Sequence, residues 1–242
     1  MKNPSRIHLQ ALSLSYESLS LIGLVILAVE TFSSATPSTN SDLLKWLSCS
    51  VFASICVFGV VAGTFPKRCS QTAYFAHREE FFEKEENHGK TVIPFAGHHP
   101  VCGRFSSHVF RFLERTFCAG CAGLVLGAII ALLATVPYLL FGQFAAEYKV
   151  LVFWLGFATV AVGLLQYHVP EGDEGLVHFS INAIFVFGTF LLLVGTNEIM
   201  GNPVLSAYLL ILTVYWIVAR IMVSKLKHQE ICAACPQPCS IG

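Results

Sequence analysis

Six cysteine and histidine residues gather in a short stretch near the middle of the chain. They are His98, His99, Cys102, His108, Cys118 and Cys121. A Cys-x-x-Cys pair such as Cys118/Cys121 can place two thiolates on one metal ion at about 2.3 Å, and two further cysteine or histidine ligands complete a tetrahedron. The residue types and their spacing therefore predict a metal site in this stretch.

A second group of cysteines lies near the C-terminus: Cys232, Cys235 and Cys239. Two geometries are open. In one, Cys118 and Cys121 share a single ion with the first two cysteines of this tail. In the other, Cys102 and His108 complete the Cys118/Cys121 site locally and the tail is separate. We favour the local site, because its ligands need no long-range chain closure to meet.

Zinc is the metal that this ligand set favours, since cysteine and histidine both suit its tetrahedral coordination. An iron–sulfur cluster is the alternative, because the tail spacing Cys-x2-Cys-x3-Cys matches the last three cysteines of the bacterial ferredoxin run. Gln229 stands where that run has its first cysteine, and Ser240 stands where it has a proline, which weakens this interpretation. A reversible Cys118/Cys121 dithiol and inert packing of the thiols are the other interpretations.

The composition indicates an integral membrane protein. Hydrophobic residues make up 55% of the chain and charged residues only 12%, whereas soluble domains carry about 25% charged residues. The formal net charge is zero, so bulk electrostatics give no support for nucleic-acid binding. The expected partners are the lipid bilayer and, beyond it, another membrane protein complex.

Six apolar segments are candidates to cross a bilayer, most of them near the required length of about 20 residues. They span residues 19–32, 43–65, 118–141, 150–167, 179–196 and 204–222. The first segment is the weakest, and a cleaved signal peptide is its competing interpretation. Glycines at Gly59, Gly63, Gly123 and Gly127 form two small-xxx-small motifs, which predict close helix packing. The predicted fold is an all-α integral membrane protein with about six transmembrane helices.

Lysine and arginine residues predict the orientation in the membrane. Apart from Lys45 and Lys149, all of them lie near the two termini or between the second and third segments. By the positive-inside rule, both termini are therefore cytoplasmic. We divide the chain into residues 1–65 with the first two helices, a Cys/His-rich cytoplasmic insert at 66–117, helices three to six at 118–223 and a cytoplasmic tail at 224–242. A prokaryotic plasma membrane is the expected location.

The stretch from Gly97 to Gly127 resembles an uncharacterised family of small prokaryotic multi-pass membrane proteins. That family pairs a Cys/His element with a Cys-x-x-Cys-x-Gly sequence that opens a transmembrane helix, as Cys118, Cys121 and Gly123 do here. This chain differs in having Gly120 where the family has a basic residue, and in placing its paired histidines before Cys102. The resemblance implies a membrane protein with a Cys/His site and implies no reaction.

These features predict a non-enzymatic accessory, assembly or sensor protein, because a closed Cys/His site holds a structural ion. Thr116 is expected to cap the third helix and so to place Cys118 in its first turn. A membrane redox protein is the first alternative function. The second is a small ion or solute transporter that uses Glu30 and the polar ends of helices four and five. His178 and Asn182 share a helix face there, at positions i and i+4.

Overall fold

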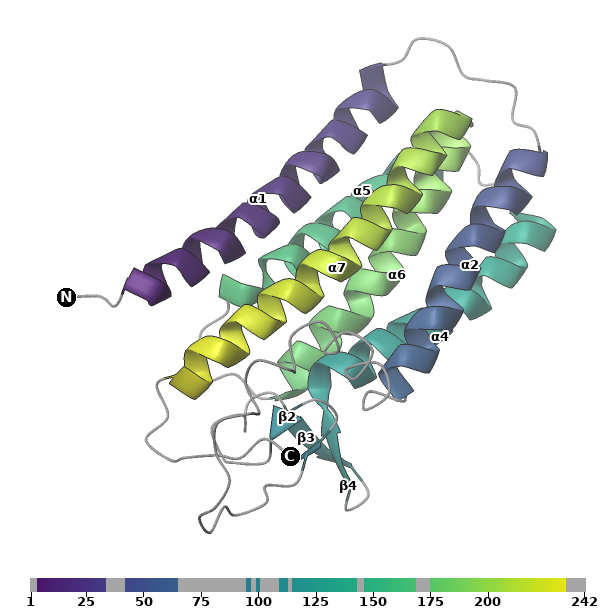
Figure 1. Ribbon diagram of the computed structural model, residues 1–242. Helices are drawn as coiled ribbons and strands as arrows, with labels where there is room; N and C mark the ends of the chain where they lie inside the picture. Colours follow the sequence, from purple (N-terminus) through teal and green to yellow (C-terminus); the bar gives the residue numbers. More distant parts are fainter. Residues whose placement is uncertain are drawn as a thin grey trace.

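The computed structural model describes residues 4–33, 42–64, 95–96, 99–100, 109–112, 115–142, 146–168 and 175–233. Six α-helices lie along one another in a bundle (Figure 1). The helices are α1 (Pro4–Ser33), α2 (Asp42–Thr64), α4 (Ala119–Phe141), α5 (Ala146–Leu164), α6 (Gly175–Ile199) and α7 (Pro203–Ala233). The smaller elements are the 3-10 helix η2 (Leu165–His168) and the strands β1 (Phe95–Ala96), β2 (His99–Pro100), β3 (Val109–Phe112) and β4 (Arg115–Cys118).

Five of the helices are long and apolar enough to cross a membrane: Gln10–Ser33, Asp42–Thr64, Ala119–Phe141, Gly175–Ile199 and Pro203–Lys227. The sixth, α5, is an apolar helix of 19 residues that packs mainly against α6. The prediction of a helical chain with apolar helices of membrane-spanning length is therefore confirmed, with five such helices in the described part of the chain where about six were predicted. The first and last helices extend well beyond the predicted segments 19–32 and 204–222, because polar helical turns continue the apolar ones.

The α4 helix turns several small side chains to the interior of the bundle and large apolar ones outward, whereas other helices bury large apolar side chains such as Phe52, Phe153 and Trp216. In α4, Gly127, Ala131 and Thr135 are buried, whereas Leu133 and Leu140 are exposed. This pattern is the reverse of a water-soluble helix, and it suits helices whose outer surface meets lipid tails and whose small interior residues allow close approach.

Close packing of α4 on α6 depends on two glycines. A Cβ atom on Gly123 or Gly127 would overlap the carbonyl oxygen of Phe179 or of Ala183, respectively. The predicted role of this small-xxx-small motif is therefore confirmed. The motif in α2 behaves differently, because a Cβ on Gly59 would meet no atom within 4 Å. The other glycine of this motif, Gly63, lies against Val125 of α4. Only one of the two glycines therefore contributes to helix packing within the chain.

The α1 helix is joined to α7 by side chains that reach its backbone. The hydroxyl of Tyr208 donates to the carbonyl oxygen of Gly23 at 3.0 Å, and the indole of Trp216 donates to that of Ser20 at 3.3 Å. Tyrosine and tryptophan side chains that are buried usually find such a partner for their polar atom. The first helix thus packs as an element of the bundle.

Candidate functional site

The two cysteines of the central motif lie at the start of α4. Cys118 is the N-cap residue, with extended backbone angles of φ −69° and ψ 120°, and Cys121 is the third residue of the helix. Cys118 is 3% exposed and Cys121 is half-buried, and both are thiols rather than a disulfide. The prediction that Thr116 caps this helix is wrong, because the extended β4 strand continues through Cys118 and the helix begins only at Ala119.

Two short hairpins bring other parts of the insert towards Cys118. Strands β3 and β4 are antiparallel, and Val109 pairs with Cys118. Strands β1 and β2 are also antiparallel, Ala96 pairs with His99, and β1 contacts β4. The residue that directly follows His108 in the chain therefore lies opposite Cys118, and the backbone of His99 lies in a hairpin beside the same strand. These strands depart from the purely helical prediction.

Most of the other predicted ligands lie outside the described residues: His98, Cys102, His108, Cys235 and Cys239. Within the described part of the chain, no group of three or more histidine, cysteine or acidic residues is suited to hold a metal ion. The structure therefore brings together Cys118 and Cys121 and leaves the identity of their co-ligands a prediction.

A buried polar group, which we name the inner cluster, lies beside the start of α4. It consists of Gln166, His178, Asn182 and Arg220. The Arg220 guanidinium, on a residue only 7% exposed, donates to Gln166 Oε1 and to Asn182 Oδ1 at 2.6 Å each, and to the carbonyl oxygen of Gly163. It also lies 4.4 Å from the centroid of the Phe185 ring. Charged hydrogen bonds of this kind make the inner cluster a rigid joint between α5, α6 and α7.

The hydrogen bonds of the inner cluster determine the tautomer of His178. Gln166 Oε1 accepts from Arg220 and also from Asn182 Nδ2 at 3.1 Å. These two donors identify that atom as the amide oxygen, so the Gln166 atom that faces His178 is the amide nitrogen. That nitrogen lies 3.3 Å from His178 Nδ1, which must therefore accept. His178 is then neutral with its proton on Nε2, an arrangement that does not offer Nε2 to a metal ion. The predicted shared face of His178 and Asn182 is confirmed.

The inner cluster lies directly against the cysteine motif. Cys118 Sγ and Asn182 Nδ2 both lie 4.0 Å from the point where a Cβ atom on Gly120 would stand. A Cβ on Gly123 would lie 2.9 Å from Asn182 Cβ. Since Asn182 is 3% exposed, the first turn of α4 closes over it, and the approach at Gly123 leaves no room for a Cβ atom.

The tail cysteines bear on the choice between the two predicted geometries. The backbone of Cys232 lies in the last turn of α7. Twelve residues separate it from Arg220, which places it about 18 Å further along the helix axis at 1.5 Å per residue. In Figure 1 this end of α7 lies to one side of β3 and β4. The choice between a local site and one shared with the tail stays a prediction.

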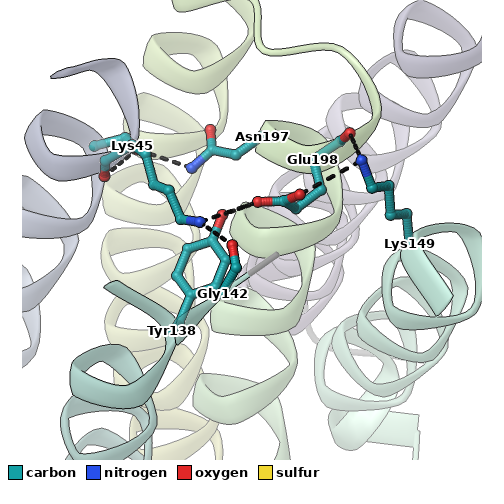
Figure 2. A network of polar contacts seen from close by, with 7 residues as sticks. Lys45, Tyr138, Gly142, Lys149, Asn197 and Glu198 are labelled. Atoms are coloured by element: carbon teal, nitrogen blue, oxygen red, sulfur yellow. Dashed lines mark hydrogen bonds and ion pairs between the residues drawn. The ribbon is translucent and has the colours of Figure 1, made fainter. Parts of the chain in front are cut away.

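A second polar network, the outer network, joins the helices at the opposite end of the bundle (Figure 2). Glu198 in α6 lies 3.2 Å from Lys45 Nζ and 3.5 Å from Lys149 Nζ. The hydroxyl of Tyr138 donates to Glu198 Oε1 at 3.1 Å, and Lys45 also donates to the carbonyl oxygen of Gly142. One carboxylate thus connects α2, α4, α5 and α6.

Neutral side chains extend the outer network to α7. Asn197 donates to Ser48 Oγ at 2.9 Å and accepts from Ser206 Oγ at 2.7 Å. The sequence interpretation missed this network, because the predicted fifth segment ends at residue 196, before Asn197 and Glu198. The sequence signal that could have indicated this network is the pair Lys45 and Lys149, which the positive-inside rule places on the side opposite to the other basic residues.

Replacing Glu198 by glutamine is expected to lower the free energy of unfolding by about 1–2 kcal/mol, since it leaves two partly buried lysines close together without their shared carboxylate. Thermal unfolding in detergent, followed by circular dichroism, measures the loss. Glu30→Gln is the matched control, because Glu30 lies on an exposed position of α1. Equal stability of the Glu198→Gln variant and the unchanged protein would contradict a role for this network.

Charged residues are buried in the spans at more places than the sequence interpretation expected. Glu17 is 8% exposed and Arg220 is 7% exposed. Glu30, in contrast, lies at an exposed position of α1, and the transporter hypothesis that uses it stays a prediction.

The resemblance of residues 97–127 to the uncharacterised family stays a prediction. A comparison of the whole chain with protein-family models, with curated proteins and with solved structures found no match.

Proposed function

We propose that this chain is a multi-pass membrane protein that binds a zinc ion at the cytoplasmic end of α4 through Cys118, Cys121 and ligands of the insert. The observation that carries the proposal is the pairing of Val109 with Cys118 in the β3–β4 hairpin. This pairing places Val109, the residue that follows His108, directly opposite Cys118. Two thiols at the start of one helix, with a strand beside them that begins one residue after His108, suit tetrahedral zinc.

The surroundings of the motif support a structural ion rather than a catalytic one. Cys118 is almost fully buried, and Asn182 of the inner cluster packs against the same turn. A catalytic zinc needs an open coordination position for water or substrate, whereas a closed site stabilises the fold. The ion would fasten the insert to α4 and shape a surface on which another membrane protein complex docks. This is the role of an accessory, assembly or sensor component.

The proposed orientation has six membrane crossings with both termini and the insert in the cytoplasm. The α5 helix has 19 residues, which at 1.5 Å per residue give about 28 Å, close to the thickness of a hydrocarbon core. Lys45 and Lys149 share the carboxylate of Glu198, so one of the two positive charges at the outer end is balanced. Exposed Trp46 and Tyr148 near the same end suit a membrane–water interface. A prokaryotic plasma membrane fits these features.

A redox protein is the second candidate function. It is favoured by the position of Cys118 and Cys121 at the N-cap and third residue of a helix, where the unpaired backbone N–H groups and the helix dipole favour a thiolate. A dithiol that cycles to a disulfide, or an iron–sulfur cluster, would use the same residues. Visible absorption separates an iron–sulfur cluster from zinc, because zinc proteins are colourless, and metal content separates a metal-free dithiol from both.

Elemental analysis of the purified protein tests the proposal. We expect about one zinc per chain in protein prepared without chelator, and loss of that zinc in a Cys118→Ser/Cys121→Ser variant, since a tetrahedral site does not survive without two of its ligands. The matched control is Cys49→Ser/Cys56→Ser, which changes two buried cysteines of α2 and should keep the zinc. Absence of metal from the unchanged protein, or equal zinc in all three, would overturn the proposal.

A further inference from the structure

The strand that leads into α4 has one buried and one exposed face. Phe117 is 39% exposed, whereas the next residue, Cys118, is 3% exposed. Successive residues of a strand belong to opposite faces, and residues paired across an antiparallel ladder share a face. The β3–β4 hairpin therefore has an inner face, which includes Cys118, and an outer face, which includes Phe117.

The outer face of this hairpin consists of aromatic residues and one arginine. Phe117 pairs with Phe110, and Arg115 pairs with Phe112. Arg115 is two positions before Phe117 in β4, so the register places all four residues on the outer face. The remaining positions of the ladder belong to the inner face: Val109, Arg111, Thr116 and Cys118.

The chain places the base of this hairpin at the level of the lipid headgroups. The α4 helix is long and apolar enough to cross a membrane, and β4 joins it without a break. Figure 1 shows β3 and β4 at the end of the bundle where α4 begins. At about 3.3 Å per residue, Phe117 lies at most about 7 Å from the first residue of the span. A headgroup layer is about 5–7 Å thick on each side of the hydrocarbon core, so Phe117 and Phe110 lie within it for any tilt of the hairpin.

The composition of the outer face suits the surface of a bilayer. Surface elements that bind lipid bury phenylalanine at the boundary between headgroups and acyl chains. A guanidinium forms paired, charged hydrogen bonds with a phosphate, and the cytoplasmic leaflet carries a negative surface potential that attracts arginine. The three phenylalanines and Arg115 thus match the two layers that they would meet.

We infer that the outer face of the β3–β4 hairpin lies on the cytoplasmic surface of the bilayer and binds anionic phospholipid. Phe110 and Phe117 occupy the headgroup layer, and Arg115 binds a lipid phosphate. The inference rests on the membrane orientation of the proposed function and not on its metal. Contact of the outer face with lipid keeps the inner face, with Cys118, turned towards the bundle.

Quenching of an added tryptophan by brominated lipid tests the inference. The full chain with Phe117→Trp is placed in nanodiscs of phosphatidylcholine and phosphatidylglycerol in equal amounts, with bromine on the acyl chains of only one of the two lipids. Subtracting the fluorescence of the unchanged protein gives the signal of the added side chain. We expect quenching by both lipids, and about 2-fold or more stronger quenching by brominated phosphatidylglycerol, because an arginine near the surface concentrates anionic lipid.

The two arginines of the hairpin supply the matched control. In the Phe117→Trp protein, Arg115→Gln should remove the preference for the anionic lipid and leave the quenching by phosphatidylcholine. Arg111→Gln removes the same charge from the inner face and should keep most of the preference. Phe58→Trp, at a 75% exposed position of α2, should be quenched equally by the two lipids.

Absence of quenching by either lipid would overturn the inference and would indicate that water or a partner protein covers this face. Equal quenching by the two lipids, or equal effects of Arg111→Gln and Arg115→Gln, would also overturn it. If the Phe117→Trp protein is not monodisperse in size-exclusion chromatography, Phe110→Trp reports from the paired position with the same expected results. Zinc content is measured on the same samples, so a missing metal with the lipid preference intact would count against the proposed function alone.

Discussion

Replacing Gly127 by leucine is expected to abolish the folded bundle. A Cβ atom at this position would overlap the carbonyl oxygen of Ala183 and would lie 3.0 Å from its Cα atom. Because the obstacle is backbone, no change of side-chain rotamer relieves it, and α4 must separate from α6. We expect a loss of more than about 3 kcal/mol, at the upper end of overpacking effects. Size-exclusion chromatography in detergent would show aggregate in place of a monodisperse peak.

The matched control for this variant is Gly59→Leu. It introduces the same side chain into the other small-xxx-small motif, where a Cβ meets no atom within 4 Å. The replacement should be tolerated, and it should add stability of up to about 1 kcal/mol from helix propensity. If Gly127→Leu behaved like Gly59→Leu, the close α4–α6 contact would be wrong.

Replacing Asn182 by leucine is expected to give the second large effect. Asn182 accepts from Arg220 and donates to Gln166, so an isosteric apolar side chain leaves a buried guanidinium and a buried amide oxygen short of a partner. Together these losses amount to about 3–5 kcal/mol. Thermal unfolding in detergent measures the effect on stability.

The matched control is Asn182→Asp, which keeps an acceptor for Arg220 at the same place. It should retain more of the stability than Asn182→Leu, since a carboxylate accepts a charged hydrogen bond from a guanidinium. Equal loss in the two variants would show that the bond to Arg220 contributes nothing. Because Asn182 packs against Gly123 in the first turns of α4, Asn182→Leu should also weaken zinc binding by about 10-fold or more, as substitutions behind a metal site do.

The sequence predicted the helices well because a bilayer imposes a length and an apolar composition on each of them. It also predicted the packing role of Gly123 and Gly127, because a four-residue spacing places both on one helix face. The same spacing at Gly59 and Gly63 did not distinguish a face that packs within the chain from one that faces outward. That difference depends on the neighbouring helix, which a single segment does not specify.

The buried charges were the main omission. Arg220 counted in the sequence as one of the basic residues that orient the chain, yet it binds Gln166 and Asn182, which are 54 and 38 positions away. Glu198 likewise binds residues of other helices. Average hydropathy hides one charge among many apolar residues, and partners that distant are set by the packing of the bundle. The four-residue strands β3 and β4 were missed because they are too short for a clear alternating pattern.

The inner cluster and the outer network lie at opposite ends of the bundle. The inner cluster joins α5, α6 and α7 beside the cysteine motif, and the outer network joins α2, α4, α5 and α6 at the other end. The α6 helix takes part in both. An ion at Cys118 and Cys121 would therefore stabilise the end of the bundle at which the proposed docking surface forms.

X-ray absorption spectroscopy at the zinc edge of the purified protein tests the metal site most directly. We expect a tetrahedral ion with at least two sulfur ligands at about 2.3 Å and histidine nitrogen at about 2.0–2.1 Å. The sulfur signal should disappear in the Cys118→Ser/Cys121→Ser variant and persist in Cys49→Ser/Cys56→Ser. A zinc spectrum with only oxygen and nitrogen neighbours, or protein that carries no zinc at all, would contradict a thiolate metal centre at the start of α4.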